Sequence, residues 1–313
     1  MTDETSTTPR EGTAAASEPG PREGTAAASE PSPRQGPAPA PEARTAATSG
    51  PSIAAPASAV LGLPPPRLLR WEIVAVFAIS LGGSGLYALL SYIGTLTARQ
   101  SVSSQATVLN GTLAPGRPLF GLFLQLLNIA LALAPVLMVF YLLARAGEGP
   151  ADIGLDARHP VQDTARGAVL AAVIGGSGLA LYLGAYHLGV EVNVVAESLP
   201  VIWWRIPVLL LSAAQNAAVE EIIVIGYLLS RLDKLGVKPG RAIAISAVIR
   251  GSYHLYQGPG AFLGNAVMGA IFGYLYRRWG RITPLFIAHF LIDAVTFVGY
   301  ALLAGHVSWL PAP

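Results

Sequence analysis

The chain lacks cysteine and has few charged residues. None of its 313 residues is a cysteine, which excludes disulfide bonds, thiolate metal ligands and a cysteine nucleophile. Charged residues make up 12% of the chain, about half of the roughly 25% found in soluble domains. The net charge of +2 is too small to favour a nucleic acid as partner. Glutamate, aspartate, histidine and hydroxyl side chains are left for any chemistry.

Apolar residues, in contrast, make up 52% of the chain and gather in about seven segments. These segments are residues 71–94, 119–144, 164–188, 206–230, 241–256, 260–279 and 283–303. Apolar runs near 20 residues are long enough to cross a bilayer as helices, although the fifth segment is short for a span. The sequence therefore predicts an all-α polytopic membrane protein with about seven transmembrane helices.

The N-terminal region has a different composition. Residues 1–66 are rich in Ala, Pro, Ser, Thr, Gly and Glu, and the segment PREGTAAASEP occurs twice. Such a segment cannot bury enough apolar surface to offset its chain entropy, so it is predicted to be a disordered tail. Its acidic residues and missing apolar region argue against a signal peptide. The predicted domains that follow are 67–204 (N-terminal helices with an interfacial segment), 205–304 (intramembrane core) and 305–313 (tail).

Loop charges predict the orientation in the membrane. If the N-terminus is cytoplasmic, most basic residues near the ends of the spans lie on the inner side: Arg67, Arg70, Arg145, Arg158, Arg166, Arg231, Lys234, Lys238, Arg241, Arg277, Arg278 and Arg281. The outer flanks then carry only Arg99, Arg117 and Arg205. This asymmetry follows the positive-inside rule and places the C-terminus outside. The predicted location is the cell membrane, with the lipid bilayer as one partner.

Two adjacent carboxylates, Glu220 and Glu221, lie within the fourth apolar segment. Charged side chains are costly in lipid, so they are expected to face a polar interior. Neighbouring helical positions point about 100° apart, which suggests a base at one position and a structural ion pair at the other. Arg250, on the fifth segment, is the obvious partner for one of them, because an unpaired charge within a span is very costly. A purely structural role for the whole group stays open.

Two further pairs are spaced four residues apart, so each shares one helical face: Arg250 with His254, and His289 with Asp293. A carboxylate and an imidazole can activate water while other groups stabilise an oxyanion. Two histidines with acids could instead bind a divalent metal, although no HExxH motif is present. Intramembrane acids and histidines also mark ion relays in transporters. Spacing alone does not decide among these readings.

The order of the motifs resembles a known family. The segments AVEEIIVIGYLLSRL and SYHLYQGPGAFLGNAVMGAIFGYLYRRWGRITPLFIAHFLIDAV are similar to the CPBP family of intramembrane peptidases, also called Abi or CAAX-protease-like. The likeness covers roughly residues 205–303. It implies that the last four helices form a peptidase core and that the protein is a glutamic intramembrane endopeptidase without a cofactor, its metal dependence left open. The implied substrate is a membrane-embedded or membrane-associated peptide or protein, with no nucleic acid as partner.

The resemblance also implies roles for individual residues. In the family, the first Glu of the pair and the histidine of the second motif activate water, which corresponds to Glu220 and His254. The histidine and Asn or Asp of the third motif bind the carbonyl oxygen, which corresponds to His289 and Asp293. An ionised Asp293 would only accept hydrogen bonds, so it would have to be protonated or to orient His289 instead. Glu221 would support the group.

The chain departs from the family pattern at two positions. The expected arginine is replaced by Ile225, and the expected phenylalanine is replaced by Arg250. We predict that the Arg250 guanidinium reaches the same carboxylate from the opposite helix. The alternative is a non-catalytic relative whose site has changed, or a transporter or binding scaffold that uses the same polar cavity.

Overall fold

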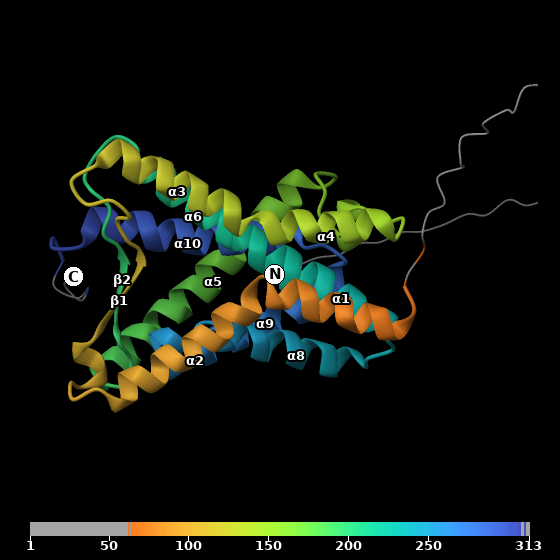
Figure 1. Ribbon diagram of the computed structural model, residues 1–313, viewed down its shortest axis with the longest axis horizontal. Coiled ribbons are helices and arrows are strands. Elements are labelled where there is room, and N and C mark those ends of the chain that lie inside the picture. Colours follow the sequence, from red (N-terminus) through yellow and green to blue (C-terminus); the bar gives the residue numbers. More distant parts are fainter. Residues whose placement is uncertain (1–61, 63, 308–309, 311–313) are drawn as a thin grey trace, which may run out of the picture. The chain divides into compact units, whose positions relative to one another are not determined.

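The structure, a computed structural model, describes residues 62, 64–307 and 310, which are mostly helical (Figure 1). Helices form at all seven predicted apolar segments. In chain order they are α1 (Pro66–Ala78), α2 (Leu81–Thr97), α3 (Pro118–Ala132), α4 (Ala134–Arg145), α5 (Pro160–His187), α6 (Arg205–Glu220), η3 (Glu221–Tyr227), α7 (Leu228–Lys234), α8 (Pro239–Ser252), α9 (Pro259–Trp279) and α10 (Thr283–Leu303). Of the predicted disordered tail, residues 1–61 and 63 lie outside this description.

Fewer of these helices than predicted are long and apolar enough to cross a membrane. Among the described residues four segments qualify: Pro118–Arg145, Pro160–His187, Arg205–Lys234 and Thr283–Leu303. A fifth is formed by α1 and α2 if this pair, bent by 53°, counts as one broken span. Helix α8 has only 14 residues, and α9 is less apolar than the four. The predicted count of seven spans is therefore not confirmed, whereas the predicted helical structure is, with four or five candidate spans among the described residues.

The prediction of purely helical structure missed a small sheet. Strand β1 (Ala106–Asn110) pairs in parallel with β2 (Asn193–Glu197), in the register Ala106↔Asn193 to Asn110↔Glu197. The β2 sequence NVVAE carries β-branched valines, which favour strands. Three short 3₁₀ turns complete the description: η1 (Val102–Ser104), η2 (Pro150–Ile153) and η4 (Leu255–Gln257). The sheet packs near α10 and ties the segment before α3 to the segment before α6.

Two apolar clusters hold the helices together. The first surrounds η3 and includes Ile223, Leu229 and Phe272, which are all fully buried. The second lies where α6 meets α10 and includes Trp204 and Phe297. Helix α10 also packs against α5, and α8 packs closely against α9. These contacts place the polar side chains of α6, α8 and α10 within one interior region.

The segment between α6 and α7 is a π-helix, a form that occurs mostly as short insertions within α-helices and is frequent at functional sites. It begins at Glu221, directly after the first carboxylate of the pair. The Ser246 hydroxyl donates to the Val224 carbonyl over 3.0 Å and satisfies an acceptor within it. No feature of the sequence analysis predicted this change of helix type.

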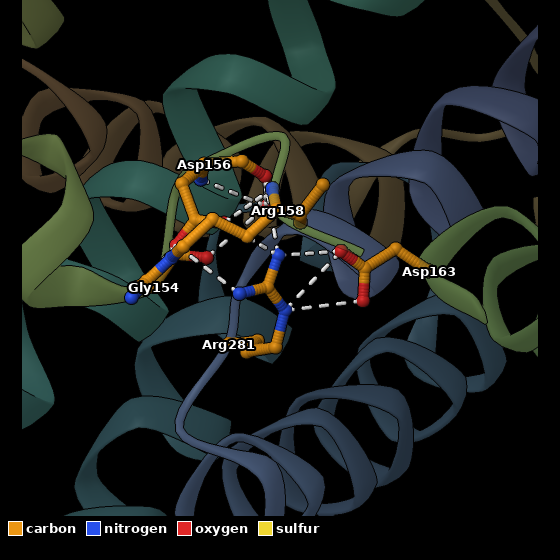
Figure 2. Close-up of polar contacts among 6 residues, drawn as sticks. Gly154, Asp156, Arg158, Asp163 and Arg281 are labelled. Atoms are coloured by element: carbon orange, nitrogen blue, oxygen red, sulfur yellow. Dashed lines mark hydrogen bonds and ion pairs between the residues drawn. The ribbon is translucent and has the colours of Figure 1, made fainter. Parts of the chain in front are cut away.

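A cluster of charges joins the start of α5 to the start of α10 (Figure 2). The Arg281 guanidinium contacts the carboxylates of Asp156 and Asp163 at 2.9 and 2.6 Å, and Arg158 contacts Asp156 at 2.6 Å. The two guanidinium groups hold the pKa of Asp156 well below its usual range. Beside them, Gly154 has a φ of 72°, and a Cβ there would lie 2.2 Å from the Gly280 carbonyl oxygen. Only glycine allows this approach.

Candidate active site

Both predicted carboxylates are buried and share one guanidinium. Glu220 and Glu221 have 7% and 0% of their surface exposed, and Arg250 is 0% exposed. Arg250 lies 2.8 Å from Glu221 Oε1 and 3.2 Å from Glu220 Oε2. Its guanidinium carbon also lies 5.2 Å from the centre of the Phe272 ring. The predicted pairing across two helices is confirmed, and the arginine on α8 reaches both members of the pair.

The two oxygens of Glu220 have different surroundings. Oε2 accepts a hydrogen bond of 2.9 Å from the Tyr253 hydroxyl and faces Arg250. Oε1 lies 3.6 Å from His254 Nε2, longer than a hydrogen bond but close enough for both atoms to bind one water molecule. Among the described residues, His254 Nε2 is buried without a hydrogen-bond partner. Glu220 therefore has one oxygen fixed and one oxygen directed at the imidazole.

His289, on α10, contacts the other side of the carboxylate pair. Its Nδ1 lies 2.9 Å from Glu221 Oε1 and 3.1 Å from Arg250. One nitrogen cannot both donate to the carboxylate and accept from the guanidinium. The acceptor on Glu221 favours the tautomer with hydrogen on Nδ1. His289 Nε2 is then directed towards Asp293, whose Oδ1 lies 3.7 Å away.

Asp293 has a partner that the sequence analysis did not name. Asn216 Nδ2 donates to Asp293 Oδ2 over 2.9 Å. Asn216 lies four residues before Glu220, on the same face of α6. That spacing is the signal that could have identified it. Tyr253 was also missed, because it precedes His254 directly and nothing in the sequence indicates that both side chains contact Glu220.

A cavity of about 650 Å³ opens beside this group. Its polar lining comes from residues of α6 and of the segment after α8: Gln215, Asn216, Glu220, Tyr253, His254 and Tyr256. Most of the remaining lining comes from the break between α1 and α2 and from α2, α3 and α4, with Leu81 and Tyr87 of α2 among the residues. Arg250, Glu221, His289 and Asp293 are not part of the lining. The cavity thus reaches two of the four residues predicted to be catalytic.

Within the described residues, no three histidine or acidic side chains converge as ligands for a metal ion. The guanidinium of Arg250 occupies the space between Glu220, Glu221 and His289, where such an ion would have to lie. A cation adjacent to this fixed positive charge would be repelled.

Comparisons with known proteins match one part of the chain. Residues 202–295 match the family described as Type II CAAX prenyl endopeptidase Rce1-like. No curated protein and no solved structure matches the chain. The matched part includes α6, α8 and α9, and extends into α10 beyond Asp293, so it contains every residue of the group described above. Residues 202–295 therefore carry the sequence pattern of the Type II CAAX prenyl endopeptidase Rce1-like family, as the three motifs predicted.

Proposed function

We propose that the protein is an intramembrane endopeptidase that hydrolyses a peptide bond by direct attack of water. The observation that carries this proposal is the approach of Glu220 Oε1 to His254 Nε2, 3.6 Å apart, in two residues that both line the 650 Å³ cavity. The family match supports the same reaction class, because its description names an endopeptidase.

In the proposed reaction a water molecule binds between Glu220 Oε1 and His254 Nε2. As the water oxygen bonds to the carbonyl carbon, Glu220 takes up one of its protons. The carbonyl oxygen becomes an oxyanion, and the carbon–nitrogen bond then breaks as the proton passes to the departing nitrogen. No covalent intermediate with the protein forms. Tyr253 and Arg250 hold Oε2 so that Oε1 keeps its direction.

The supporting group lies behind this pair. Glu221 binds Arg250 and His289, and both interactions hold the guanidinium next to Glu220. We assign Glu221 and Arg250 supporting roles; the resemblance would place His289 and Asp293 on the side of the carbonyl oxygen, but neither lines the cavity. The arrangement requires no metal or cofactor for the attack.

We further propose that the substrate is a membrane-embedded or membrane-associated peptide or protein. Apolar residues of the α1–α2 break and of α3 line one wall of the cavity, and the catalytic pair lies on the other. An apolar stretch of polypeptide fits the first wall while its peptide bond faces the second. In this proposal residues 205–304 form the peptidase core, seven helices cross or enter the bilayer, and the N-terminus is cytoplasmic.

The direct test uses purified protein in liposomes with an apolar reporter peptide, and compares the wild type with Glu220→Gln and His254→Ala. Glu220→Gln keeps the shape of the side chain but removes the base, so we expect cleavage to fall by about 10²–10⁴-fold. Continued cleavage by both variants would refute the proposal.

Two further measurements separate the alternatives. Cleavage that persists in the presence of a chelator supports activation by the carboxylate, whereas its loss, restored by added divalent metal, would favour a metal site. Ion flux through the liposomes that depends on Glu220, without any cleavage, would favour a transporter instead.

A further inference from the structure

Asn216 has a side-chain amide in the place where the proposed reaction needs a donor. We propose that this amide binds the carbonyl oxygen of the scissile peptide bond and stabilises its oxyanion. The inference rests on the proposed hydrolysis and adds a catalytic residue to it. In this proposal the hydrogen-bond donor to the oxyanion is Asn216 of α6 and not Asp293 of α10.

Asp293 is poorly suited to this task in the observed arrangement. Its Oδ2 accepts a hydrogen bond from Asn216 and its Oδ1 faces His289 Nε2 at 3.7 Å. Neither oxygen is therefore presented as a donor to a carbonyl group in the cavity. In addition, neither Asp293 nor His289 lines the cavity.

Asn216, in contrast, lines the cavity together with Glu220 and His254. It is only partly buried and lies one helical turn from Glu220, about 6 Å along the axis at 1.5 Å per residue. That spacing leaves room for an attacking water and a carbonyl group between the two side chains.

The orientation of the Asn216 amide follows from its neighbours. Gln215 Nε2 donates to Asn216 Oδ1 over 3.3 Å, and Asn216 Nδ2 donates to Asp293 over 2.9 Å. The reversed amide would place an oxygen against the carboxylate and a nitrogen against the Gln215 nitrogen, which is unfavourable on both sides. Nδ2 carries two hydrogens, and only one is used by Asp293. The second is free for a carbonyl oxygen.

The arrangement gives Asp293 a different role. It is a positioning residue that fixes the direction of the Asn216 amide through the hydrogen bond between them. This accounts for an acceptor at position 293, where the resemblance would have placed an oxyanion donor.

The test is a cycle of four proteins: wild type, Asn216→Ala, Asp293→Ala and the double variant, measured as kcat and KM on the reporter peptide. Loss of one oxyanion donor lowers kcat by about 10²–10³-fold. We expect Asn216→Ala to show this loss with little change in KM. In the Asp293→Ala background Gln215 still orients the amide, so Asn216→Ala is expected to lower kcat a further tenfold or more.

A structural role for Asn216 predicts another result. If Asn216 only satisfies Asp293, its removal has no effect on kcat once Asp293 is gone, and that result would overturn the proposal. Thermal unfolding of each variant identifies any that fail to fold. In the Asp293→Ala background, removal of Asn216 leaves no carboxylate at position 293 without its partner. Asn265→Ala is the matched control, because Asn265 bonds to its own helix at Ala261 and does not line the cavity.

The outcome also separates this inference from the hydrolysis itself. Cleavage that requires Glu220 but is unaffected by Asn216→Ala leaves the proposed function standing and refutes the role of Asn216. Cleavage that survives Glu220→Gln refutes both.

Discussion

Arg250 pairs with two buried carboxylates at once. Both Glu220 and Glu221 lie within 3.2 Å of it, and all three side chains are almost fully enclosed. Removing one partner of such a group leaves buried charge uncompensated, which typically costs about 3–5 kcal/mol. We therefore expect Arg250→Leu to lower the thermal stability in detergent by that amount.

The matched control for this prediction is Arg277→Leu. Arg277 pairs with Asp233 at 2.7 Å, but Asp233 is half exposed and solvent screens the interaction. Surface ion pairs of this kind contribute about 0–1 kcal/mol. Equal losses of stability in the two variants would contradict the special role of Arg250.

The exchange of residues between positions 225 and 250 can be tested in the same assay. Ile225 is fully buried within η3, where the family pattern has arginine. If a guanidinium from either helix can serve the pair, Ile225→Arg with Arg250→Phe recovers part of the stability and cleavage lost in Arg250→Phe alone. A double variant no better than the single one would show that η3 cannot present the cation.

At the scale of single residues, the sequence indicated which ionisable side chains meet in the interior, but it did not indicate the neutral side chains that contact them. Glu220, Glu221, Arg250 and His289 stand out because charges are expensive among apolar residues. An uncharged Asn or Tyr side chain costs less free energy among apolar residues, so the presence of Asn216 and Tyr253 there did not indicate a functional role. Their roles depend on atoms of other helices and become visible only in the folded chain.

At the scale of elements, the close packing of α8 on α9 depends on Gly269. A Cβ at this position would lie 3.0 Å from Arg250 Cδ and 3.1 Å from Ala247 Cα. We expect Gly269→Ala to destabilise the protein by about 1–3 kcal/mol, as overpacking does, and to lower cleavage by displacing Arg250. Thermal unfolding and the reporter assay measure the two effects.

Gly176, on α5, provides a control for which replacement by alanine is expected to change the stability in the opposite direction. A Cβ there meets no atom within 4 Å. Replacing glycine by alanine within a helix normally stabilises it by about 0.5–1 kcal/mol. Gly176→Ala is therefore expected to be neutral or stabilising, and a loss equal to that of Gly269→Ala would argue against the packing explanation.

Hydrophobic periodicity and length predicted where helices form, because burial of apolar side chains dominates that choice. They did not predict the β1–β2 pair, whose partners are far apart in the sequence. They also could not show that η3 is a π-helix, since its residues are compatible with an ordinary helix and packing decides between the two.

At the scale of the whole molecule, the cluster around Arg281 predicts a response to acid. The pKa of Asp156 is lowered by hydrogen bonds from Arg158 and Arg281. A lowered pKa in the folded state means that this stabilisation is present above the unfolded value, about 3.9, and is lost as the pH falls below it. We expect the unfolding temperature to drop between about pH 4 and the low pKa, and the drop to be smaller in Asp156→Asn.

Arg158→Gln refines this prediction. It removes one of the two cations beside Asp156 but leaves the contacts of Arg281 with Asp156 and Asp163. The drop in unfolding temperature at acid pH is expected to be smaller than in the wild type and larger than in Asp156→Asn. An unchanged profile in both variants would exclude Asp156 as its source.

The absence of cysteine makes the proposed orientation easy to measure. A single cysteine can be introduced without a background of native thiols. Lys238→Cys, in the loop between α7 and α8, is expected to react with an impermeant reagent only from the cytoplasmic side. Gly116→Cys, before α3, is expected to react only from outside, and the reverse pattern would invert the proposed topology.

The π-helix also sets the rotation about the helix axis between two separate ion-pair networks. On its N-terminal side Glu220 faces Arg250, and on its C-terminal side Tyr227 and Arg231 both bind Glu72 of α1. A π-helix has more residues per turn than an α-helix, because its hydrogen bonds span five residues rather than four. The seven residues of η3 therefore turn the chain through a smaller angle than seven α-helical residues would, and an α-helix of the same length would change the angle between the two networks. The seven residues from Glu221 to Tyr227 thus set the angle at which one continuous helical segment presents Glu220 to Arg250 and Arg231 to Glu72 of α1.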